Sequence, residues 1–424
     1  MKLLVYGINF HPEPTGIGKF SGEMTARLAA LGHEVRVVTA PPYYPSWRIF
    51  DGWRNAYASS EWKGVRVWRA PLWVPAVPNG LKRVLHLLSF AVASVPLMLR
   101  QCLWQPDVVL VVAPAMACAP GAWLTARACG ARAWLHVQDF EVDAAFQLGL
   151  LNSNGLRRRW VNAVESWLLR RFDRVSTISH RMLQRAMEKG VPREVLVYLP
   201  NWVDEGQVRP IDRVSRYREQ LGIRPGAVVA LFSGTLGGKQ GLELLPTMAR
   251  LLQEQRRNGQ AEVVLVICGD GVMKPLLEAQ VQGLANVRML PLQPAEQVNE
   301  LLNLADIHLL PQHPGAADVV MPSKLSAMLA SGRPVVTTTH PGTELERVVQ
   351  QCGRVVLPDD PQALASAVRD LADDPALCQQ LGLAARRYAE DHLAKTAVLS
   401  RLESCLLACL QQERSGLELP VELS

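Results

Sequence analysis

Short apolar runs alternate with stretches of helical periodicity near the start of the chain. Lys2–Ile8 is a short apolar run before a turn-rich segment, and Glu34–Thr39 is a second one. Between them, Lys19–Leu31 repeats apolar residues at the spacing of a helix face, and Gly32 follows as a helix-ending residue. The pattern predicts a strand, a helix and a strand in succession. Such a βαβ unit implies a parallel sheet.

The same alternation then runs through two long series, the first interrupted at residues 41–80 and the second starting at Ala227. We therefore predict an α/β protein with two doubly wound, Rossmann-like domains that face each other across a cleft. Ligands of such sheets bind at the carboxyl ends of the strands. The predicted parts are an N-terminal domain, 1–202, a C-terminal domain, 203–385, and a helical tail, 386–424, that packs back on the N-terminal domain. The polar segment 203–218 is interpreted as the linker.

The composition is that of an ordinary α/β protein with a mild positive charge. The 424 residues are 49% hydrophobic and 20% charged, with a net charge of +6. This charge fits an anionic ligand or an anionic membrane surface, and no sequence pattern of a nucleic-acid-binding module is present. The eight cysteines show neither Cys-x-x-Cys pairs nor metal-ligand spacing, which indicates reduced thiols in the cytoplasm and no metal site.

Two neighbouring segments raise the question of a membrane or lipid contact. Residues 41–80 contain the aromatic run that ends at Trp47, which suits a sugar- or lipid-contacting surface and equally suits a loop pinned to its own domain. The apolar segment Val84–Leu99 follows Lys82 and Arg83 and contains Pro96, so it is too short and too broken to span a bilayer. We expect a surface-lying helix at about 82–103, with a helix packed in the core as the alternative.

Three turns between a strand and a helix are candidates for binding a phosphate. The first holds Gly16 and Gly18, and the second is the glycine-rich run 233–241, which includes Lys239. In the third, a loop with Asp318 leads to Pro322, which is typical of a first helical position. Small residues let the backbone approach a ligand, and a fresh helix N-terminus favours an anion. The alternatives are a plain helix start and a solvated surface lysine.

Two nucleotide-dependent classes are excluded by the same turns. The Gly16–Gly18 turn lacks the third glycine of a dinucleotide fingerprint, and the strand 34–39 does not end in an acid. Lys239 is followed by Gln240, whereas a Walker A loop requires serine or threonine there. The sequence therefore argues against a nicotinamide cofactor and against a nucleoside-triphosphate hydrolase.

Further polar residues follow other predicted strands. His136 lies near the end of the strand 132–137, where it can bond a sugar hydroxyl or move a proton, and the acids at 139–143 follow it. Gly271 belongs to a tight turn after the strand 263–268, which can bring backbone groups to a nucleobase or be ordinary turn chemistry. The chain has no Asp-x-Asp motif, which weakens any mechanism that needs a carboxylate-held divalent cation.

Over nearly its whole length the chain resembles a GT-B glycosyltransferase of family 4, in the subgroup of colanic-acid biosynthesis. The stretches that carry the resemblance are YGINFHPEPTGIGKFSGEM, GHEVRVVTAPPYYPSW, LKRVLHLLSFAVAS, HVQDFEVDA, SGTLGGKQGLE and GAADVVMPSKLSAMLASG. The resemblance implies a retaining, metal-independent transfer from a nucleotide sugar, with GDP-fucose as the donor assigned to the subgroup. It implies a lipid-linked oligosaccharide as acceptor, at the anionic cytoplasmic face of the membrane.

The resemblance also assigns roles to individual residues. It implies that His136 lies near the transferred sugar and Lys239 at the diphosphate, as the catalytic pair. Trp47, Lys82 and Arg83 are expected on the acceptor and membrane side of an acceptor-binding N-terminal domain. The residues expected to bind the donor are Gly16, Gly18, Gly234, Thr235, Gly271, Asp318, Pro322, Ser323, Lys324 and Leu325.

The chain departs from the family pattern in its acids and cations. The first of the family's paired glutamates falls on Val319, with Asp318 beside it as a possible substitute, and the second falls on Ala327. Thr235 stands where the family often has arginine, and Lys239 comes one residue early. Two other functions therefore stay open from the sequence: a nucleotide-sugar epimerase or phosphorylase on the same plan, and a non-catalytic nucleotide-sugar-binding partner of a polysaccharide assembly complex.

Overall fold

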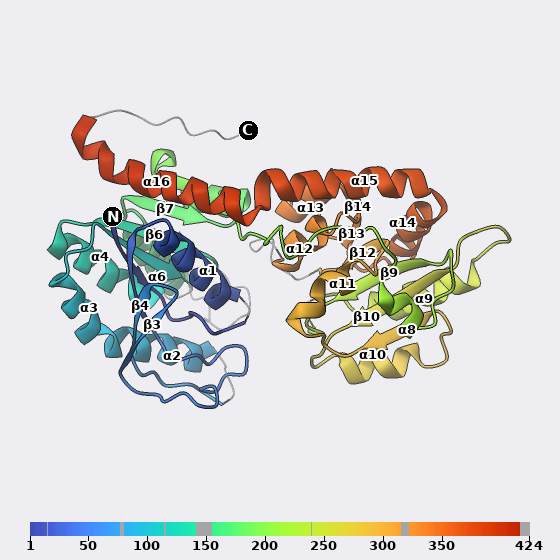
Figure 1. Cartoon of the computed structure of the whole chain (residues 1–424), viewed down its shortest axis with the longest axis horizontal. Helices are drawn as coiled ribbons and strands as arrows, with labels where there is room; N and C mark the ends of the chain where they lie inside the picture. The colour runs from blue at the N-terminus through green and yellow to red at the C-terminus, as the bar shows by residue number, and fades with distance from the viewer. Residues whose placement is uncertain are drawn as a thin grey trace. The chain divides into compact units, whose positions relative to one another are not determined.

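The chain forms two compact units. The computed structural model describes residues 1–14, 16–76, 80–113, 116–140, 155–238, 240–314 and 322–415. The first unit comprises Met1–Pro200 with Val398–Ser424, and the second comprises Asn201–Ala397. Figure 1 shows helices packed around a sheet in each unit. The last helix, α16 (Lys395–Ser415), begins in the second unit and continues into the first.

The sheet of the first unit has the strand order β3-β4-β2-β1-β5-β6-β7-β8. Neighbouring strands pair in parallel, except that β3 and β4 form an antiparallel hairpin in the aromatic insertion. The central strands are continuous apolar runs because helices cover both faces of a parallel sheet, and every residue of β5 is buried. The strands are β1 (Lys2–Tyr6), β2 (Glu34–Thr39), β3 (Ala58–Trp62), β4 (Val65–Arg69), β5 (Val108–Ala113), β6 (Arg132–Val137), β7 (Arg174–Thr177) and β8 (Leu196–Tyr198).

Helices connect these strands, as the alternating pattern predicts. The helices are α1 (Gly16–Ala30), α2 (Gly80–Ala93), α3 (Val95–Cys102), α4 (Ala119–Cys129), α6 (Gly155–Leu169) and α7 (His180–Glu188), with short helical turns at Met116–Cys118 and Arg193–Val195. Glu403 of α16 belongs to this unit and lies 2.8 Å from the His33 ring nitrogen, Nε2.

The sheet of the second unit is wholly parallel among the residues described, with the order β11-β10-β9-β12-β13-β14. Its strands are β9 (Val228–Ser233), β10 (Val263–Cys268), β11 (Val287–Leu290), β12 (Ile307–Leu310), β13 (Val335–Thr338) and β14 (Gly353–Val356). The helices are α8 (Arg216–Gln220), α9 (Leu244–Glu254), α10 (Lys274–Val281), α11 (Val298–Leu302), α12 (Lys324–Ala330), α13 (Glu344–Val349), α14 (Pro361–Asp373) and α15 (Pro375–Tyr388), with helical turns at Ala295–Gln297 and Ala389–Leu393. The buried faces of α9 and α14 share one apolar core with the sheet.

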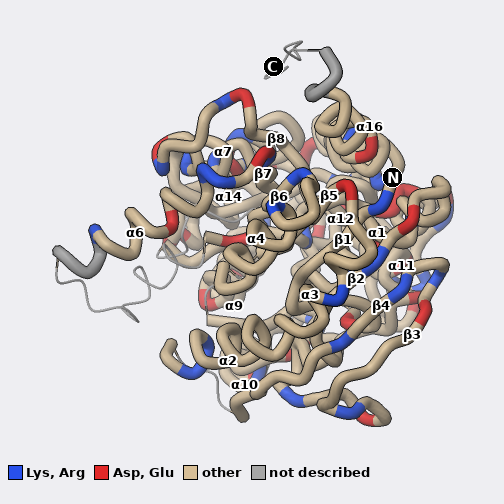
Figure 2. Tube along the Cα trace, turned by 90° about the vertical axis from the view of Figure 1, so that its left-hand side faces the viewer, with Lys and Arg blue, Asp and Glu red and all other residues tan. Residues whose placement is uncertain are grey.

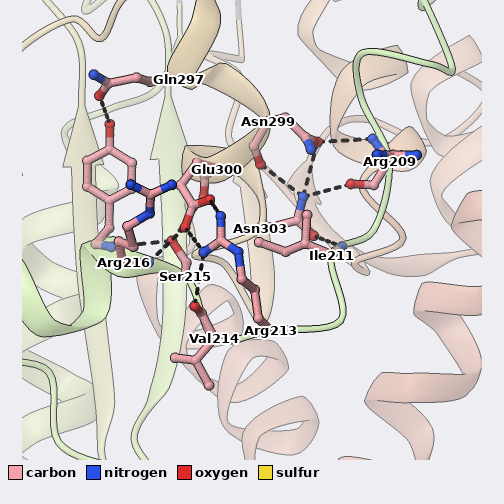
Figure 3. Close-up of polar contacts among 11 residues, drawn as sticks. Arg209, Ile211, Arg213, Val214, Ser215, Arg216, Gln297, Asn299, Glu300 and Asn303 are labelled. Carbon is pink, nitrogen blue, oxygen red and sulfur yellow. Dashed lines mark hydrogen bonds and ion pairs between the residues drawn. The ribbon is translucent and has the colours of Figure 1, made fainter.

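The segment expected to be a linker is instead an integral part of the second unit. Figure 3 shows residues 209–216 bonded to α11. The Asn303 side chain accepts a hydrogen bond from the backbone of Ile211 at 3.1 Å and donates to the carbonyl of Arg209 at 2.9 Å. Glu300 forms an ion pair with Arg213 and accepts from the backbone N–H of Arg216. The segment is therefore held to α11 and to the residue after it, mainly through its own backbone groups and through the Arg213 side chain.

Candidate active site

Two glycine turns of the second unit pack backbone against backbone at the carboxyl ends of β9 and β10. The Gly234 N–H donates to the Cys268 carbonyl at 2.9 Å, and Leu236 donates to Asp270 at 2.8 Å. A Cβ atom on Gly271 would lie 2.4 Å from the Leu236 carbonyl oxygen, and φ of Gly271 is +150°. Only glycine fits at this position. The predicted donor-binding residues Gly234 and Gly271 are thus brought together, whereas Thr235 is exposed.

Lys324 extends its ammonium group over the first of these turns, the one after β9. Its Nζ donates to the Gln240 side-chain oxygen at 2.9 Å and lies 4.2 Å from the centre of the Phe232 ring. A Cβ atom on Gly234 would come within 2.9 Å of Nζ, so the lysine passes over the bare glycine backbone. Burial lowers the pKa of Lys324 to about 8. Within the part of the chain that the structure describes, this ammonium forms no ion pair with a carboxylate.

The helix after β12 begins later than its proline predicts. Ser323 is the N-cap of α12 and makes no side-chain capping bond, while Pro322 precedes it. Leu325 is buried among apolar side chains of the second unit, so its side chain packs the core. Lys239 and Asp318 lie outside the described residues. The roles predicted for these two and for the helix start stay predictions.

In the first unit, the predicted turn after β1 is organised around a buried acid that the sequence reasoning missed. Glu13 accepts hydrogen bonds from the backbone N–H groups of Tyr43 and Tyr44 at 3.1 and 2.9 Å, and from the Asn9 side chain at 2.9 Å. A Cβ atom on Gly18 would lie 2.6 Å from the Glu13 carboxylate. This contact explains the glycine at position 18.

Burial raises the pKa of Glu13 to about 7, against the opposing effect of its three hydrogen bonds. The carboxylate joins the turn after β1 to the aromatic segment after β2. Gly16 begins α1 with φ of +62°, and the ring of Tyr44 lies 3.7 Å from the position of a Cβ atom there. The sequence signal for this clamp is an acid between two prolines beside the first turn.

His136 lies inside the first unit, on β6. Its Nδ1 is 2.9 Å from the hydroxyl of Ser176 on β7, and its Nε2 is 3.1 Å from the Gln138 amide. The same hydroxyl accepts a hydrogen bond from the Trp134 indole at 2.8 Å. Burial lowers the pKa of His136 to about 4, so the ring is neutral at neutral pH. In this arrangement the histidine joins two strands, and its contact with the transferred sugar stays a prediction.

The aromatic segment is anchored to α2. The Trp47 ring lies 5.3 Å from the His86 ring and 5.8 Å from that of Tyr43, and the Arg83 guanidinium lies 5.6 Å from Trp47. His86 is buried, with its Nδ1 at 2.6 Å from the Trp73 carbonyl. The segment is therefore pinned to its own domain. It also places Trp47 and Arg83, two residues predicted on the acceptor side, in contact.

Helices α2 and α3 present one apolar face to solvent. Their other face is packed: Phe90 contacts Tyr6 with 5.8 Å between ring centres, and Ser94 bonds the Tyr6 hydroxyl. Figure 2 shows few charged positions on α2 and α3. The exposed apolar side chains recur at the spacing of a helix face. They are Leu81, Val84, Leu85, Leu88, Val92, Val95, Leu99 and Leu103.

The segment Gly80–Cys102 lies close to the helix expected at about 82–103. Its 23 residues make it, among the residues described, the single helix long and apolar enough to cross a membrane by length and composition. Its packed face nevertheless fixes it to the domain, since the buried Gln101 side chain accepts a hydrogen bond from Arg36. The alternative of a helix buried in the core is wrong, because 28% of its most apolar window is buried.

The comparisons with known proteins decide the family. A glycosyl transferase 4-like domain matches residues 15–202, and a glycosyl transferases group 1 domain matches residues 227–374. The chain is 41% identical over 94% of its length, and 98% of the relative's, to the Escherichia coli (strain K12) protein named as a colanic acid biosynthesis glycosyl transferase, WcaI. The chain belongs to the group 1 glycosyltransferase family. It is therefore a glycosyltransferase, as the resemblance implied.

Solved structures of glycosyltransferases confirm the predicted GT-B class of two Rossmann-like domains. Sucrose-phosphate synthase from Thermosynechococcus elongatus has a TM-score of 0.72 at 16% identity, covering 96% of this chain and 99% of that one. Anabaena HepE, solved in complex with UDP-glucose, has a TM-score of 0.66 at 14% identity over 96% of this chain and its own full length. Among the described residues, no group of three or more His, Cys, Asp or Glu is placed to hold a metal ion.

Proposed function

We propose that this glycosyltransferase moves a sugar from a nucleotide sugar, GDP-fucose in the first instance, to a lipid-linked oligosaccharide during assembly of a colanic-acid-like exopolysaccharide. The observation that carries the proposal is the 41% identity, over nearly the full length of both chains, to the protein named for colanic acid biosynthesis. The complex of HepE with UDP-glucose supports a nucleotide sugar as the donor class. No observation favours an epimerase or a non-catalytic partner once the family is known.

The proposed reaction retains the configuration of the anomeric carbon and needs no metal. The bond between that carbon and the diphosphate oxygen breaks, and both electrons stay on the oxygen. The acceptor hydroxyl oxygen forms the new bond from the same side, and its proton passes to the departing phosphate oxygen. The charge that grows on the nucleoside diphosphate is what the protein must stabilise. Lys239 and the helix starts are proposed to do so, and the proposed place of His136 is near the transferred sugar.

The proposed acceptor is supported by the exposed apolar face of α2 and α3. A helix whose one face is fixed to the domain and whose other face is apolar suits the interface of a bilayer. Lys82 and Arg83, at the start of α2, add attraction to anionic lipid. We propose that the enzyme is cytoplasmic and lies peripherally on the inner face of the membrane, where a lipid-linked acceptor is within reach.

Calorimetry on the purified protein in EDTA tests the donor. GDP, UDP, ADP and their common sugar conjugates are titrated in turn. We expect GDP and GDP-fucose to bind without metal. Tighter binding of UDP or ADP would be consistent with a glycosyltransferase but would refute GDP-fucose as the donor. A requirement for a divalent cation would refute the metal-independent mechanism. Lys239→Ala is expected to lower turnover strongly with an intact fold, and normal turnover would refute its role.

A further inference from the structure

We propose that α4 and α6 form a second membrane contact, separate from the α2–α3 face, which binds the anionic interface of a lipid bilayer. This inference rests on the proposed membrane association of the enzyme and goes beyond it, because that proposal uses only α2 and α3. A layer of helices, rather than one helical segment, then lies on the bilayer. The sheet behind this layer runs parallel to the membrane, and the carboxyl ends of its strands open along the membrane surface.

Helix α6 presents an aromatic and apolar face to solvent. Trp160, Val164 and Trp167 follow one another at the spacing of a single helix face. Trp160 is 74% exposed, and about half of each of the other two side chains is exposed. The opposite face of the helix is packed, since Leu168 and Leu169 are buried. The exposed face therefore belongs to a helix that is docked on its domain, and such a patch marks an interaction surface.

The patch continues from α6 onto α4. The ring centres of Trp167 and of Trp123, on α4, are 6.3 Å apart. The Arg171 guanidinium lies 4.6 Å from the centre of the Trp167 ring and 5.6 Å from that of Trp123. Beside Trp123, the side chain of Leu124 is 58% exposed. The two helices thus share one surface, which combines apolar side chains with a cation.

This surface lies on the same face of the sheet as α2 and α3. Helix α4 connects β5 to β6 and α6 connects β6 to β7, so the two connections run in one direction along the strand order. Right-handed connections in one direction place their helices on one face of a parallel sheet. Helix α3 packs against α4, and Figure 2 shows α4 between α3 and α6. A flat partner that touches the α2–α3 face can therefore reach α6 as well.

The charges of these helices favour an anionic partner. The basic residues of α2, α3, α4 and α6 are Lys82, Arg83, Arg100, Arg127, Arg157, Arg158 and Arg159. The single acid in the sequences of these four helices, Glu165, is buried and paired with Lys189 at 2.5 Å. The next helix, α7, ends this pattern, because its Glu188 lies 2.8 Å from Arg185. The positive charge is therefore concentrated on the same helices that expose apolar side chains.

A lipid bilayer fits this surface better than a second copy of the chain does. Tryptophan and arginine are typical of protein segments at the membrane–water interface, and each basic residue near an anionic leaflet adds attraction. A second copy would bring an equally basic surface into contact, and like charges repel. The chain's own segment 141–154, which precedes α6 in the sequence, is the other occupant that the experiment must distinguish.

The test is co-sedimentation of the full chain with vesicles of phosphatidylcholine and phosphatidylglycerol. Leu124→Gln/Val164→Gln removes one exposed apolar side chain from α4 and one from α6, and it should lower the partition coefficient by about tenfold. The matched control is Val272→Gln/Leu276→Gln, in the second unit, where the exposed fractions are 85% and 47%. This control should bind as wild type does. Thermal unfolding of both variants should match the wild type, because the substituted side chains are largely exposed.

A second measurement detects direct contact between α6 and lipid. Phospholipids brominated on their acyl chains quench the fluorescence of tryptophans that enter the bilayer. Trp160→Phe keeps an apolar aromatic ring, so it should retain most of the vesicle binding while losing part of the quenching. Quenching that is unchanged in Trp160→Phe would show that this side chain does not enter the bilayer, and it would overturn the inference.

The outcomes separate this inference from the proposed membrane association. If the wild type does not bind the vesicles, the membrane association fails and the inference fails with it. If the wild type binds and Leu124→Gln/Val164→Gln binds equally well, only the inference is refuted. Unchanged vesicle binding with a lower unfolding temperature would show that segment 141–154 covers this face. Loss of a dimer in sedimentation velocity, with unchanged vesicle binding, would assign the face to a second copy; both results overturn the inference.

Discussion

Removing two exposed apolar side chains from the α2–α3 face should detach the protein from membranes without affecting its fold. Val92 is 70% exposed and Leu99 is 65% exposed, and both lie on the face turned away from Tyr6. Fully burying a valine or leucine side chain contributes about 2 kcal/mol, so these exposed fractions make about 1.4 and about 1.3 kcal/mol available to lipid. The sum, about 2.7 kcal/mol, corresponds to a change of about 100-fold in partitioning.

The assay is co-sedimentation with vesicles that contain anionic phospholipid. Val92→Gln/Leu99→Gln should reduce the partition coefficient by about 100-fold if lipid covers both side chains fully, and by about tenfold if it covers half of each. The matched control is Val214→Gln/Leu292→Gln, in the second unit, where the exposed fractions are 73% and 68%. This control removes the same apolar surface from positions outside the proposed membrane face, so it should partition as wild type does.

Two results would refute this reasoning. An equal loss of binding for both double variants would show that any exposed apolar surface matters, not this face. A decrease of less than about threefold for Val92→Gln/Leu99→Gln would show that α2 and α3 do not contact lipid, since even half coverage predicts more. Thermal unfolding of both variants should match the wild type because the four side chains are mainly exposed.

The remaining predictions concern charge and the buried polar groups of the first unit. Glutamine at both Lys82 and Arg83 should weaken vesicle binding and reduce its dependence on salt, because each basic residue contributes about 1 kcal/mol near an anionic surface. Burial raises the pKa of Glu13 to about 7, so between about pH 4.5 and 7 the folded state keeps a proton that the unfolded state has lost. The free energy of unfolding should therefore fall as the pH rises through this range, by at most about 3 kcal/mol. Urea unfolding of Glu13→Gln should not show this decrease with pH. Lys189→Met should lower the free energy of unfolding by about 3–5 kcal/mol because it leaves the Glu165 carboxylate buried, and adding Glu165→Gln should recover part of the loss; an unchanged urea midpoint would count against this. His136→Ala should destabilise by about 2–4 kcal/mol through loss of packing and of two hydrogen bonds, and a variant as stable as wild type would contradict the structural account of this ring.

The buried strands could be predicted because a strand of a parallel sheet that is covered on both faces consists of a continuous run of apolar residues. The sequence places β2 at 34–39 and β6 at 132–137, as found. It misses β3, whose residues Ala58–Trp62 are mostly exposed and carry no apolar run. An edge strand of this kind is defined by its pairing with β4, which is a tertiary property.

The glycines of the candidate site could be predicted from the sequence, but the contacts made by its charged side chains could not. Gly234 and Gly271 are recognisable from their place after strands, and the structure shows why each must be glycine. Glu13 finds its backbone partners 30 and 31 residues away, and Lys324 reaches a partner 84 residues away. Such contacts depend on how loops pack, which local pattern does not encode. His136 was expected at an open strand end, but its ring is buried and hydrogen-bonded to Ser176 and Gln138.

Transfer itself is the most direct test of the central claim. Purified enzyme is incubated in EDTA with labelled GDP-fucose and an extract of lipid-linked oligosaccharides, and label in the lipid fraction is followed over time. The account predicts enzyme-dependent incorporation without added metal, with the anomeric configuration of the donor kept in the product. The absence of transfer from GDP-fucose and from the other nucleotide sugars to any lipid-linked acceptor, by enzyme shown to be folded, would contradict it.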